Sequence, residues 1–531
     1  MTVGSPVSRR SALRYLSTTV GGLGAAALLA ACGGSSTAAS SSAATSAATS
    51  SSAAVSASAA GSSSVAASSS VAATSSSGVA TTAISSSTAA SAVTTSSIAS
   101  SPASTASSAA TQIVAPASSA EKGPATIQYW TWDQTALQAE QKSFLPQFTQ
   151  QHPDIKVNAT YVAWVTNGYF DKLQTMGASA DAPDVYWQSV AYAWDFANNG
   201  FTLNLQPYIN RSLKLDDYFT KVLSILRFPS PNGGDLYAFP SRWVASVLFY
   251  NKNLLQQAGL DAPDDTWDYQ KMIDAGTRLT VHDPDPAKSH FGVSSRSDHT
   301  MLDSMIKAYG GQVLNDNFTK CMLDQDKAVS TVQLAVDMGN KLGISPKPGE
   351  KVGGAAASFQ EGTIATTIEG SYQIDVYRQK TKFDWDIAIV PKGPVRRSIY
   401  GGPDSVSVSS MTKYPDAAWT FVQAYCGPGR DVTSYTGGSV PVYKPTASQP
   451  AWLEPGKTPS NKKALLAAAD FMDGADFSSH WIDWRSTTMN KELGPAFAGQ
   501  KSPLDACTSA TQAIDAILAK VKINKQVHPN L

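Results

Sequence analysis

The chain has 531 residues, and its 41 Lys and Arg residues balance 41 Asp and Glu residues, so the formal net charge at pH 7 is zero. It has no basic stripe or tail, which argues against nucleic acid binding and against electrostatic membrane attachment as its main function. Besides one cysteine near the start, the cysteines are Cys321, Cys426 and Cys507, whose spacing matches no metal motif. We expect buried free thiols there, with one disulfide as the alternative.

The first 31 residues have the layout of an export signal. The adjacent Arg9 and Arg10 precede an uncharged apolar run at residues 16–29, which ends in small residues followed by Cys32. This ending is typical of a bacterial lipoprotein cleavage site, so we expect the mature chain to begin at Cys32 with a lipid on its sulfur. An uncleaved anchor and an ordinary signal peptide are the alternatives. The paired arginines resemble a twin-arginine signal, although Ala12 stands where such signals usually carry a bulky apolar residue.

Residues 32–122 combine this cysteine with a segment that is almost wholly Ser, Ala, Thr and Val and has no charge before Glu121. Such a composition offers too little apolar surface to offset the entropy of ordering the chain, so we predict a disordered tether. A flexible coil of roughly 88 residues spans on the order of 50 Å. The tether would therefore hold the rest of the chain beyond a layer of cell-surface polymer.

Residues 123–531 form the remaining body. Its roughly 400 residues exceed the size at which one hydrophobic core keeps growing, so we expect two lobes. Residues 127–132 alternate like a strand, apolar residues recur at helical spacing over 137–148, and 155–161 form a second strand pattern. A strand, a helix and a strand in this order predict parallel strands with helices on the sheet faces, which is an α/β fold.

The same alternation of helices and strands continues along the body. Further helices are predicted at 169–176 and 254–258, and further strands at 182–187 and 244–250. Gly259 is expected to end its helix, and Thr266 is expected to cap the next one, with Asp268 near the positive end of the helix dipole. In open sheets of this kind ligands bind beyond the carboxyl ends of the strands, so we expect 130–133 and 187–189 beside a ligand.

Four segments of the body resemble the extracellular solute-binding proteins of ABC importers, specifically the carbohydrate-binding family that includes maltose-binding protein. They are 182–185, 237–260, 266–268 and 417–422. The resemblance implies a periplasmic-binding-protein-like fold of two α/β lobes, with a ligand cleft between them and a hinge that the chain crosses more than once. Crossings are expected near 237–245 and 399–406, with a last return near 471–481. Lobe 1 would then comprise about 123–240 and 403–470, and lobe 2 about 241–400 and 471–531.

The resemblance also implies a function. We expect high-affinity extracellular binding of a carbohydrate by hinge closure, and delivery of that ligand to the membrane-spanning permease of an ABC importer. We expect the protein to be a monomer that contacts the membrane only through its lipid anchor. We expect no catalysis, no cofactor and no metal, because the chain has no Gly-x-Ser-x-Gly or His-Glu-x-x-His motif and only six scattered histidines. The alternatives are a secreted glycoside-active enzyme and a sugar-sensing surface module. The ligand could also be another polyol, glycerol phosphate or an acidic sugar.

A sugar offers an apolar ring face and vicinal hydroxyls, so aromatic and planar polar side chains are the candidates for its site. The aromatic candidates are Trp132, Trp187, Trp243, Tyr372, Trp481 and Trp484. The polar candidates are Asp133, Gln188, Arg242, Asp298, His299, Glu369 and Asp404, with Gly402 as a turn residue that lets backbone approach a ligand. The resembling family places ligand-stacking or ligand-adjacent residues at Trp132 and Trp187. It often places a stacking Trp where this chain has Tyr372.

Overall fold

The structure, a computed structural model, describes residues 123–164, 168–176, 181–230, 233–285, 288–352, 355–436 and 438–529. The predicted signal peptide, Cys32 and the tether lie outside these residues. Every helix in the described part of the chain is too short or too polar to cross a lipid bilayer.

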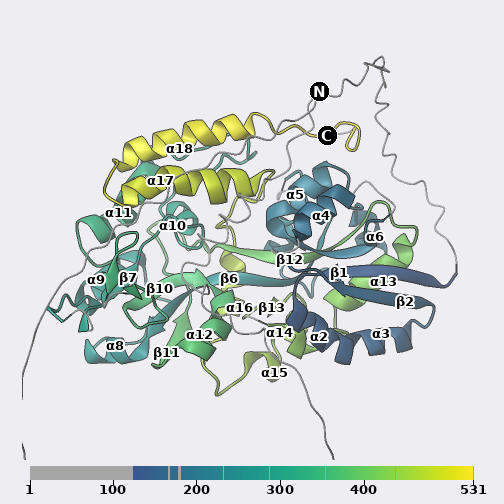
Figure 1. The fold of residues 1–531 in the computed structure, drawn as a ribbon, viewed down its shortest axis with the longest axis horizontal. Helices are drawn as coiled ribbons and strands as arrows, with labels where there is room; N and C mark the ends of the chain where they lie inside the picture. Colours follow the sequence, from purple (N-terminus) through teal and green to yellow (C-terminus); the bar gives the residue numbers. More distant parts are fainter. Residues whose placement is uncertain are drawn as a thin grey trace, which may run out of the picture. The chain divides into compact units, whose positions relative to one another are not determined.

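A mixed sheet of nine strands runs through the described body (Figure 1). Its strands are β1 (Ala125–Thr131), β2 (Ile155–Tyr161), β3 (Val185–Ser189), β6 (Phe239–Asn251), β7 (Phe291–Ser294), β10 (Ile364–Gly370), β11 (Trp385–Ala388), β12 (Gly401–Val408) and β13 (Val440–Pro441). The order is β2-β1-β3-β12-β6-β10-β7, and β11 and β13 also pair with β6. β1 is parallel to β2 and β3, which confirms the predicted α/β arrangement. Two small hairpin pairs join β4 (Arg227–Phe228) to β5 (Asp235–Leu236) and β8 (Lys351–Val352) to β9 (Ala355–Ala356).

Strand β6 links two halves of this sheet. It is 13 residues long and almost entirely buried, as its long apolar run predicts. Its residues Phe239–Ala245 pair with β12, whereas Ser246–Asn251 pair with β10 and β11. The partners of β6 therefore change between Ala245 and Ser246. We call the strands on either side of this change the β1 half (β1, β2, β3, β12, β13) and the β10 half (β7, β10, β11).

Helices cover both faces of the β1 half, with α2 and α3 on one side and α4 and α5 on the other (Figure 1). The helices around this half are α2 (Gln134–Lys142), α3 (Phe144–Gln151), α4 (Tyr169–Met176), α5 (Val190–Asn198), α6 (Gln206–Ser212), α7 (Thr220–Ile225), α13 (Pro415–Cys426), α14 (Lys444–Ala447), α15 (Pro450–Leu453) and the short η3 (Val432–Ser434). Neighbouring β3 side chains point to opposite faces, because Tyr186 contacts Phe196 of α5 while Trp187 contacts Tyr425 of α13. Both faces of this strand are therefore buried.

The β10 half carries the remaining helices. They are α8 (Lys252–Gln257), α9 (Tyr269–Leu279), α10 (Leu302–Ala308), α11 (Asp326–Asn340), α12 (Ile374–Lys380), α16 (Lys463–Ala468), α17 (Asn490–Phe497), α18 (Pro503–Leu518), the short η2 (Ser371–Gln373) and η4 (Ala469–Phe471), and the π-helical η5 (Ile482–Met489). Gly259 follows α8 with φ +62°, as expected for a helix end. The expected Thr266 cap is wrong, since Asp268 caps α9 by accepting a bond from the Lys271 backbone. Thr266 instead donates to the Asp264 carboxylate, which holds it in a turn before the helix.

Two segments connect the halves outside the sheet. After α18 the chain turns back to α5, where Asn198 bonds the backbone of Lys522 and Asn524 at 3.0 and 2.9 Å. Earlier, Glu454 pairs with Arg378 of α12 at 2.7 Å. In the first contact, Lys522 and Asn524 of predicted lobe 2 meet Asn198 of predicted lobe 1. In the second, Glu454 of predicted lobe 1 meets Arg378 of predicted lobe 2. The boundaries of the lobes stay predictions.

The three cysteines in the described part of the chain are free and buried, as expected. Burial raises the pKa of Cys321 to about 11 and that of Cys507 to about 12. At neutral pH these two thiols are therefore protonated and unreactive.

A buried ion pair lies in the core of the β1 half. The Arg430 and Glu140 side chains have no exposed surface, and their Nη2 and Oε1 atoms are 2.9 Å apart. The Arg430 guanidinium lies over the rings of Tyr425 and Tyr435 at 4.2 and 4.5 Å. Tyr425 also donates a hydrogen bond to Glu140 and accepts one from Trp187 Nε1, at 2.5 and 2.8 Å. The pair thus joins α2 and α13 to strand β3.

His299 is buried in the β10 half, 4.6 Å from the ring of Tyr400 and 5.3 Å from that of Trp481. Burial and the positive charge of Arg485 lower its pKa from 6.5 to about 4, although Asp298 acts in the opposite direction. The imidazole is therefore neutral in the folded protein at neutral pH.

We predict that Arg430→Met destabilises the protein by about 3–5 kcal/mol, because it leaves the Glu140 carboxylate buried without its counter-charge. Urea unfolding followed by circular dichroism measures this loss. Arg211→Met is the matched control, since Arg211 and Asp416 form an ion pair with side chains 56% and 65% exposed. It should cost less than about 1 kcal/mol. Equal losses in the two variants would contradict the structural role of the buried pair.

We also predict that His299 makes the protein less stable as the pH falls from 6.5 towards 4. The unfolded chain takes up a proton on this histidine in that range and the folded chain does not, so unfolding is favoured by at most about 3 kcal/mol. His299→Phe should flatten the pH dependence of the urea midpoint between pH 6.5 and 4.5. An unchanged slope in this variant would show that other groups cause the pH dependence.

Candidate functional site at the strand ends

The carboxyl ends of strands in both halves lie near the place where β6 changes partners. β3 ends at Ser189, which pairs with Asp404 near the start of β12. β10 ends at Gly370, which pairs with Ser246 of β6. Because ligands of open α/β sheets bind beyond such ends, the residues that follow β1, β3, β7 and β10 are the candidates for a site.

In the β1 half, three segments meet at Arg242, in what we call the Arg242 cluster. Arg242 Nη1 is 2.7 Å from Asp133 Oδ2, and its Nε is 2.9 Å from Asp404 Oδ2. Thr436 donates its hydroxyl to Asp133 Oδ2 at 3.2 Å. Asp133 is held in place because it is also the N-cap of α2, accepting a bond from the Ala136 backbone at 2.9 Å.

Aromatic side chains support this cluster. The Arg242 guanidinium lies 4.5 Å from the centre of the Trp187 ring, a cation–π contact. Trp132, which follows β1, packs edge-on against Trp187 at 5.2 Å and against Trp164 at 5.0 Å. Trp132 is half-buried, whereas Trp187 has no exposed surface. The ring of Trp187 is thus covered by Arg242 and its neighbours, and Trp132 lies closer to solvent.

The two carboxylates that share Arg242 have displaced pKa values. Burial raises the pKa of Asp404 above its ordinary value, and Arg242 offsets only part of this rise. Burial also acts to raise the pKa of Asp133, but there Arg242 and the bond from Ala136 outweigh it and lower the pKa. Asp133 therefore ionises more readily than Asp404.

In the β10 half, Arg296 follows β7 and holds a second group, which we call the Arg296 cluster. Its Nε is 2.5 Å from Asp298 Oδ2, and its Nη1 is 2.7 Å from Glu369 Oε1. Thr300 donates backbone and hydroxyl bonds to Asp298, and Tyr377 donates its hydroxyl to Glu369. Burial opposes ionisation, but Arg296 and the other bonds bring the pKa of Asp298 down to about 2. Asp298 is thus charged at any physiological pH.

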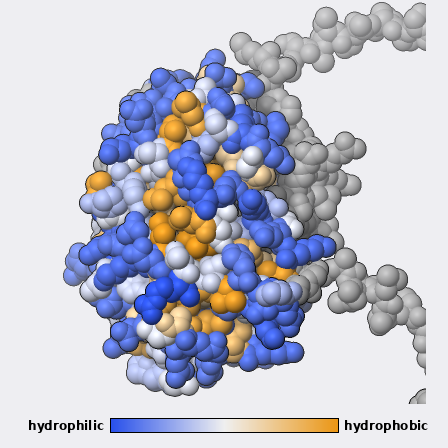
Figure 2. Space-filling view, turned by 90° about the vertical axis from the view of Figure 1, so that its left-hand side faces the viewer, coloured by the Kyte–Doolittle hydropathy of each residue, from blue (hydrophilic) through white to orange (hydrophobic). Residues whose placement is uncertain are grey.

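Tyr372 lies next to this cluster in sequence, two residues after β10, and its side chain is 43% exposed. The surface over the β10 half mixes apolar patches with hydrophilic side chains (Figure 2). Large exposed hydrophobic residues of the described chain are Tyr161, Val281, Leu342, Tyr372, Val395, Met411, Phe471 and Leu504. Exposure alone therefore does not mark a site. Tyr372 is distinguished by following the end of β10 only three residues after Glu369 of the Arg296 cluster.

The other predicted site residues are buried. Trp187, Gln188, Trp243, His299, Trp481 and Trp484 are each less than 9% exposed. Gln188 accepts a bond from Ser407, and Trp484 donates to Ser478 at 3.1 Å. A Cβ on Gly402 would lie 2.9 Å from Val190 Cγ1, so close packing explains this glycine. In this structure these residues pack behind the strand ends and offer a ligand little surface.

Four residues in the clusters were not predicted from the sequence: Arg296, Thr300, Tyr377 and Thr436. Arg296 follows β7 by two residues, and the four residues of that strand are too short a pattern to identify from the sequence. Thr436 follows no strand and matches no motif, so only the fold shows that it contacts Asp133 and Arg242.

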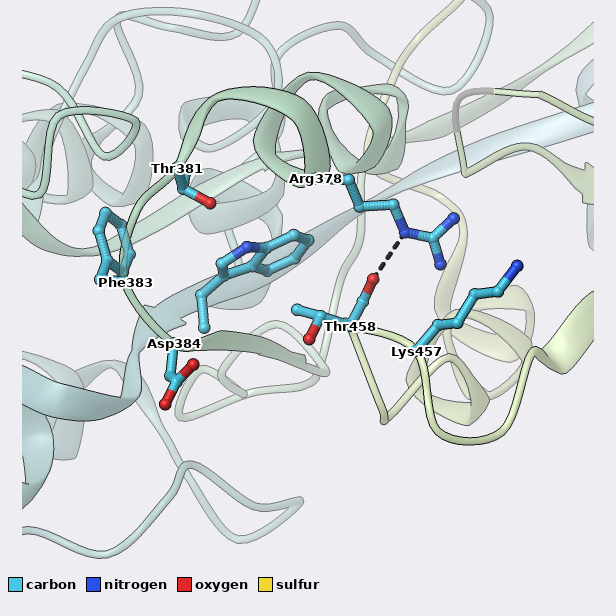
Figure 3. Close-up of a pocket in the computed structure, with 7 residues that line it drawn as sticks. Arg378, Thr381, Phe383, Asp384, Lys457 and Thr458 are labelled. Atoms are coloured by element: carbon cyan, nitrogen blue, oxygen red, sulfur yellow. Dashed lines mark hydrogen bonds between the residues drawn. The ribbon is translucent and has the colours of Figure 1, made fainter. Parts of the chain in front are cut away.

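Two surface cavities are lined by residues that belong to neither cluster. One, of about 470 Å³, is lined by Arg378, Thr381, Phe383, Asp384, Trp385, Lys457 and Thr458, and there Arg378 donates to the Thr458 carbonyl at 2.6 Å (Figure 3). The other, of about 570 Å³, is lined by Leu215, Asp216, Thr220, Leu223, Ser224, Arg227, Gly233 and Lys444. Neither contains a predicted site residue. Among the described residues, no three His, Cys, Asp or Glu side chains are grouped so as to hold a metal ion.

The sequence is similar to those of binding proteins for small solutes. It is 23% identical over 428 residues to the sn-glycerol-3-phosphate-binding periplasmic protein UgpB of Pectobacterium atrosepticum, covering 74% of this chain and 91% of that protein. It is 27% identical over 236 residues to the arabinooligosaccharide-binding protein of Bacillus subtilis, covering 44% of this chain and 51% of that protein.

The fold is similar to solved structures of sugar-binding proteins. The sugar-binding protein MalE from Xanthomonas citri superposes with a TM-score of 0.65 at 19% identity, covering 76% of this chain and all of that one. The cyclic alpha-maltosyl-1,6-maltose binding protein from Arthrobacter globiformis gives 0.63 at 20% identity, covering 75% of this chain and all of that one. These likenesses establish the fold as the two-lobed α/β fold of solute-binding proteins.

The family model of bacterial extracellular solute-binding proteins matches residues 131–429, more than half of the chain. The match begins at the end of β1, includes β6 and both arginine clusters except Thr436, and ends after α13. This chain therefore belongs to the family of bacterial extracellular solute-binding proteins, as the resemblance of its sequence motifs indicated.

Proposed function

We propose that this protein is the carbohydrate receptor of an ABC importer, binding a sugar between its two lobes and passing it unchanged to the permease. The observation that carries the proposal is that each half of the sheet presents one arginine–carboxylate cluster at its strand ends. A ligand that bonds to both clusters favours the conformation in which they approach each other. A differential affinity of roughly 5.5 kcal/mol would change a mostly open protein into a mostly closed one.

The ligand contacts follow from the exposed members of the two clusters. Carboxylates of Asp133, Asp404 and Glu369 would accept bonds from sugar hydroxyls, and the arginines would donate to ring or hydroxyl oxygens. Trp132 and Tyr372 would stack on the apolar ring faces. The buried Trp187 would act indirectly, by supporting Arg242. Several proteins with this fold are described as sugar-binding, which supports a carbohydrate as the ligand.

The N-terminal features complete the proposal. We place the protein outside the cytoplasmic membrane, anchored by a lipid on Cys32 and separated from it by the tether. The absence of charge from most of residues 33–120 and the small residues before Cys32 support this arrangement. We propose that the receptor acts as a monomer and depends on the partner subunits of the importer for energy.

One observation favours a second function, that of a glycoside hydrolase. Asp133 and Asp404 have pKa values displaced in opposite directions, as acid and base pairs of hydrolases do. Both carboxylates are bonded to the same guanidinium, however, which opposes the free protonated acid that hydrolysis needs. Binding without catalysis is therefore favoured. Release of reducing ends from a bound oligosaccharide would reverse this choice.

We predict that Tyr372→Ala weakens the binding of a saccharide about 3- to 10-fold, because the ligand loses one stacking face. Since Tyr372 is 43% exposed, the melting temperature of the ligand-free protein should stay the same. Tryptophan fluorescence titration of the purified full chain with maltose, maltotriose and an arabino-oligosaccharide measures the affinity. Leu504→Ala is the matched control, since this residue in the first turn of α18 is 56% exposed and follows no strand. Equal affinities in wild type and Tyr372→Ala would remove this residue from the site.

A further inference from the structure

We propose that this receptor selects uncharged solutes and rejects anionic ones, because two carboxylates already neutralise each arginine at the strand ends. Asp133 and Asp404, and likewise Asp298 and Glu369, would then be specificity-determining residues. The inference rests on the proposed function and narrows its ligand to an uncharged polyhydroxylated solute. The two relatives named above differ in this property of the ligand, since one is named as a binding protein for sn-glycerol 3-phosphate and the other as a binding protein for an arabino-oligosaccharide.

The Arg242 cluster shows the first neutralised arginine. Its two ion pairs are short, at 2.7 and 2.9 Å, and the Arg242 side chain is only 9% exposed. The Asp133 and Asp404 side chains are more exposed, at 15% and 25%. A solute approaching this cluster therefore meets carboxylate oxygens more readily than the guanidinium.

The Arg296 cluster also pairs one arginine with two carboxylates in the other half of the sheet. Here the Arg296 side chain is 34% exposed, and those of Asp298 and Glu369 are 29% and 15% exposed. Arg296 uses its Nε for Asp298 and its Nη1 for Glu369, and its Nη2 donates to the Ile368 carbonyl at 3.1 Å. All three nitrogens of the guanidinium thus have an acceptor within the protein. An anionic ligand that approaches Arg296 would therefore also meet the negative charges of Asp298 and Glu369.

The charges at the strand ends sum to a negative value. Two arginines and four carboxylates give a net charge of −2 for the two clusters. If Asp404 takes up a proton, the sum is still −1. The buried pairs behind them, Arg430 with Glu140 and Arg485 with Asp303, are each neutral and add nothing.

Such a site repels a phosphate group, which carries about −1.5 to −2 charges at pH 7. Binding of phosphate to Arg242 would leave Asp133 or Asp404 without its partner and close to a second anion. A binding site can reject one ligand in favour of another through unpaired or repelling charges of this kind. Hydroxyl groups of an uncharged solute are not repelled by these carboxylates. A carboxylate has about four acceptor positions, so one that is paired with arginine still accepts bonds from sugar hydroxyls.

The test compares matched solutes that differ only by a phosphate. Isothermal titration of the purified full chain uses glucose with glucose 6-phosphate, maltose with maltose 6-phosphate, and glycerol with sn-glycerol 3-phosphate. We expect the uncharged member to bind at least 100-fold more tightly in any pair that binds. Equal or tighter binding of a phosphorylated member would overturn the inference but leave a solute receptor in place. Binding of no member by the folded protein would instead contradict the proposed carbohydrate function.

Charge-removing variants test the named residues. Asp404→Asn should raise the ratio of anionic to uncharged affinity at least 10-fold, because it leaves Arg242 with one carboxylate. Asp133→Asn should do the same, and asparagine keeps the N-cap of α2, so the fold is retained. Asp416→Asn is the matched control, since it removes a carboxylate that is 65% exposed and forms an ion pair with Arg211 outside both clusters. An unchanged ratio in both cluster variants, with normal circular dichroism, would overturn the role of these carboxylates.

Discussion

The site depends on the charge of one guanidinium, that of Arg242. It joins the start of α2, the first part of β6 and the start of β12, three segments separated by more than a hundred residues each in the sequence. Burial alone would lower the pKa of Arg242, but Asp404 and Asp133 raise it above its ordinary value, so the group stays charged. Because a nearly buried charge is costly to leave unpaired, these contacts fix where the three segments lie relative to one another.

The support for Arg242 continues into the core. Its guanidinium lies on Trp187, Trp187 donates to the Tyr425 hydroxyl, and Tyr425 donates to Glu140, which is paired with Arg430. Each side chain in this series contacts the next one through a cation–π contact, a hydrogen bond or an ion pair, although Arg430 Nη1 has no hydrogen-bond partner. The buried aromatic residues therefore contribute to the site only indirectly. They set the position of a charged side chain instead of meeting the ligand themselves.

The sequence predicts the parallel strands and the long strand β6, and the end of β1 predicts Asp133 on the ligand side of the sheet. Arg242, Asp404 and Glu369 are predicted only as polar side chains suited to sugar hydroxyls. The sequence does not predict which tryptophans are exposed. Helices cover both faces of β3, so alternation along this strand carries no information about burial, and Trp187 is as buried as Tyr186. Arg296 follows β7, which has only four residues and too short a pattern to identify. The α9 cap was misplaced because Thr266 and Asp268 are both good N-cap residues, and only the turn at Asp264 decides between them.

The two clusters lie on either side of the point where β6 changes partners. Arg242 lies on the β12-paired part of the strand, and Glu369 pairs with Val247 just beyond the change. A rotation about Ala245 and Ser246 would alter the separation of the clusters while leaving the ion pairs inside each one intact. Since each cluster carries a net negative charge, their approach is opposed by repulsion when nothing lies between them. Hydroxyl groups of an uncharged ligand would donate to both sets of carboxylates and reduce this repulsion, which is the differential interaction that ligand-driven closure requires.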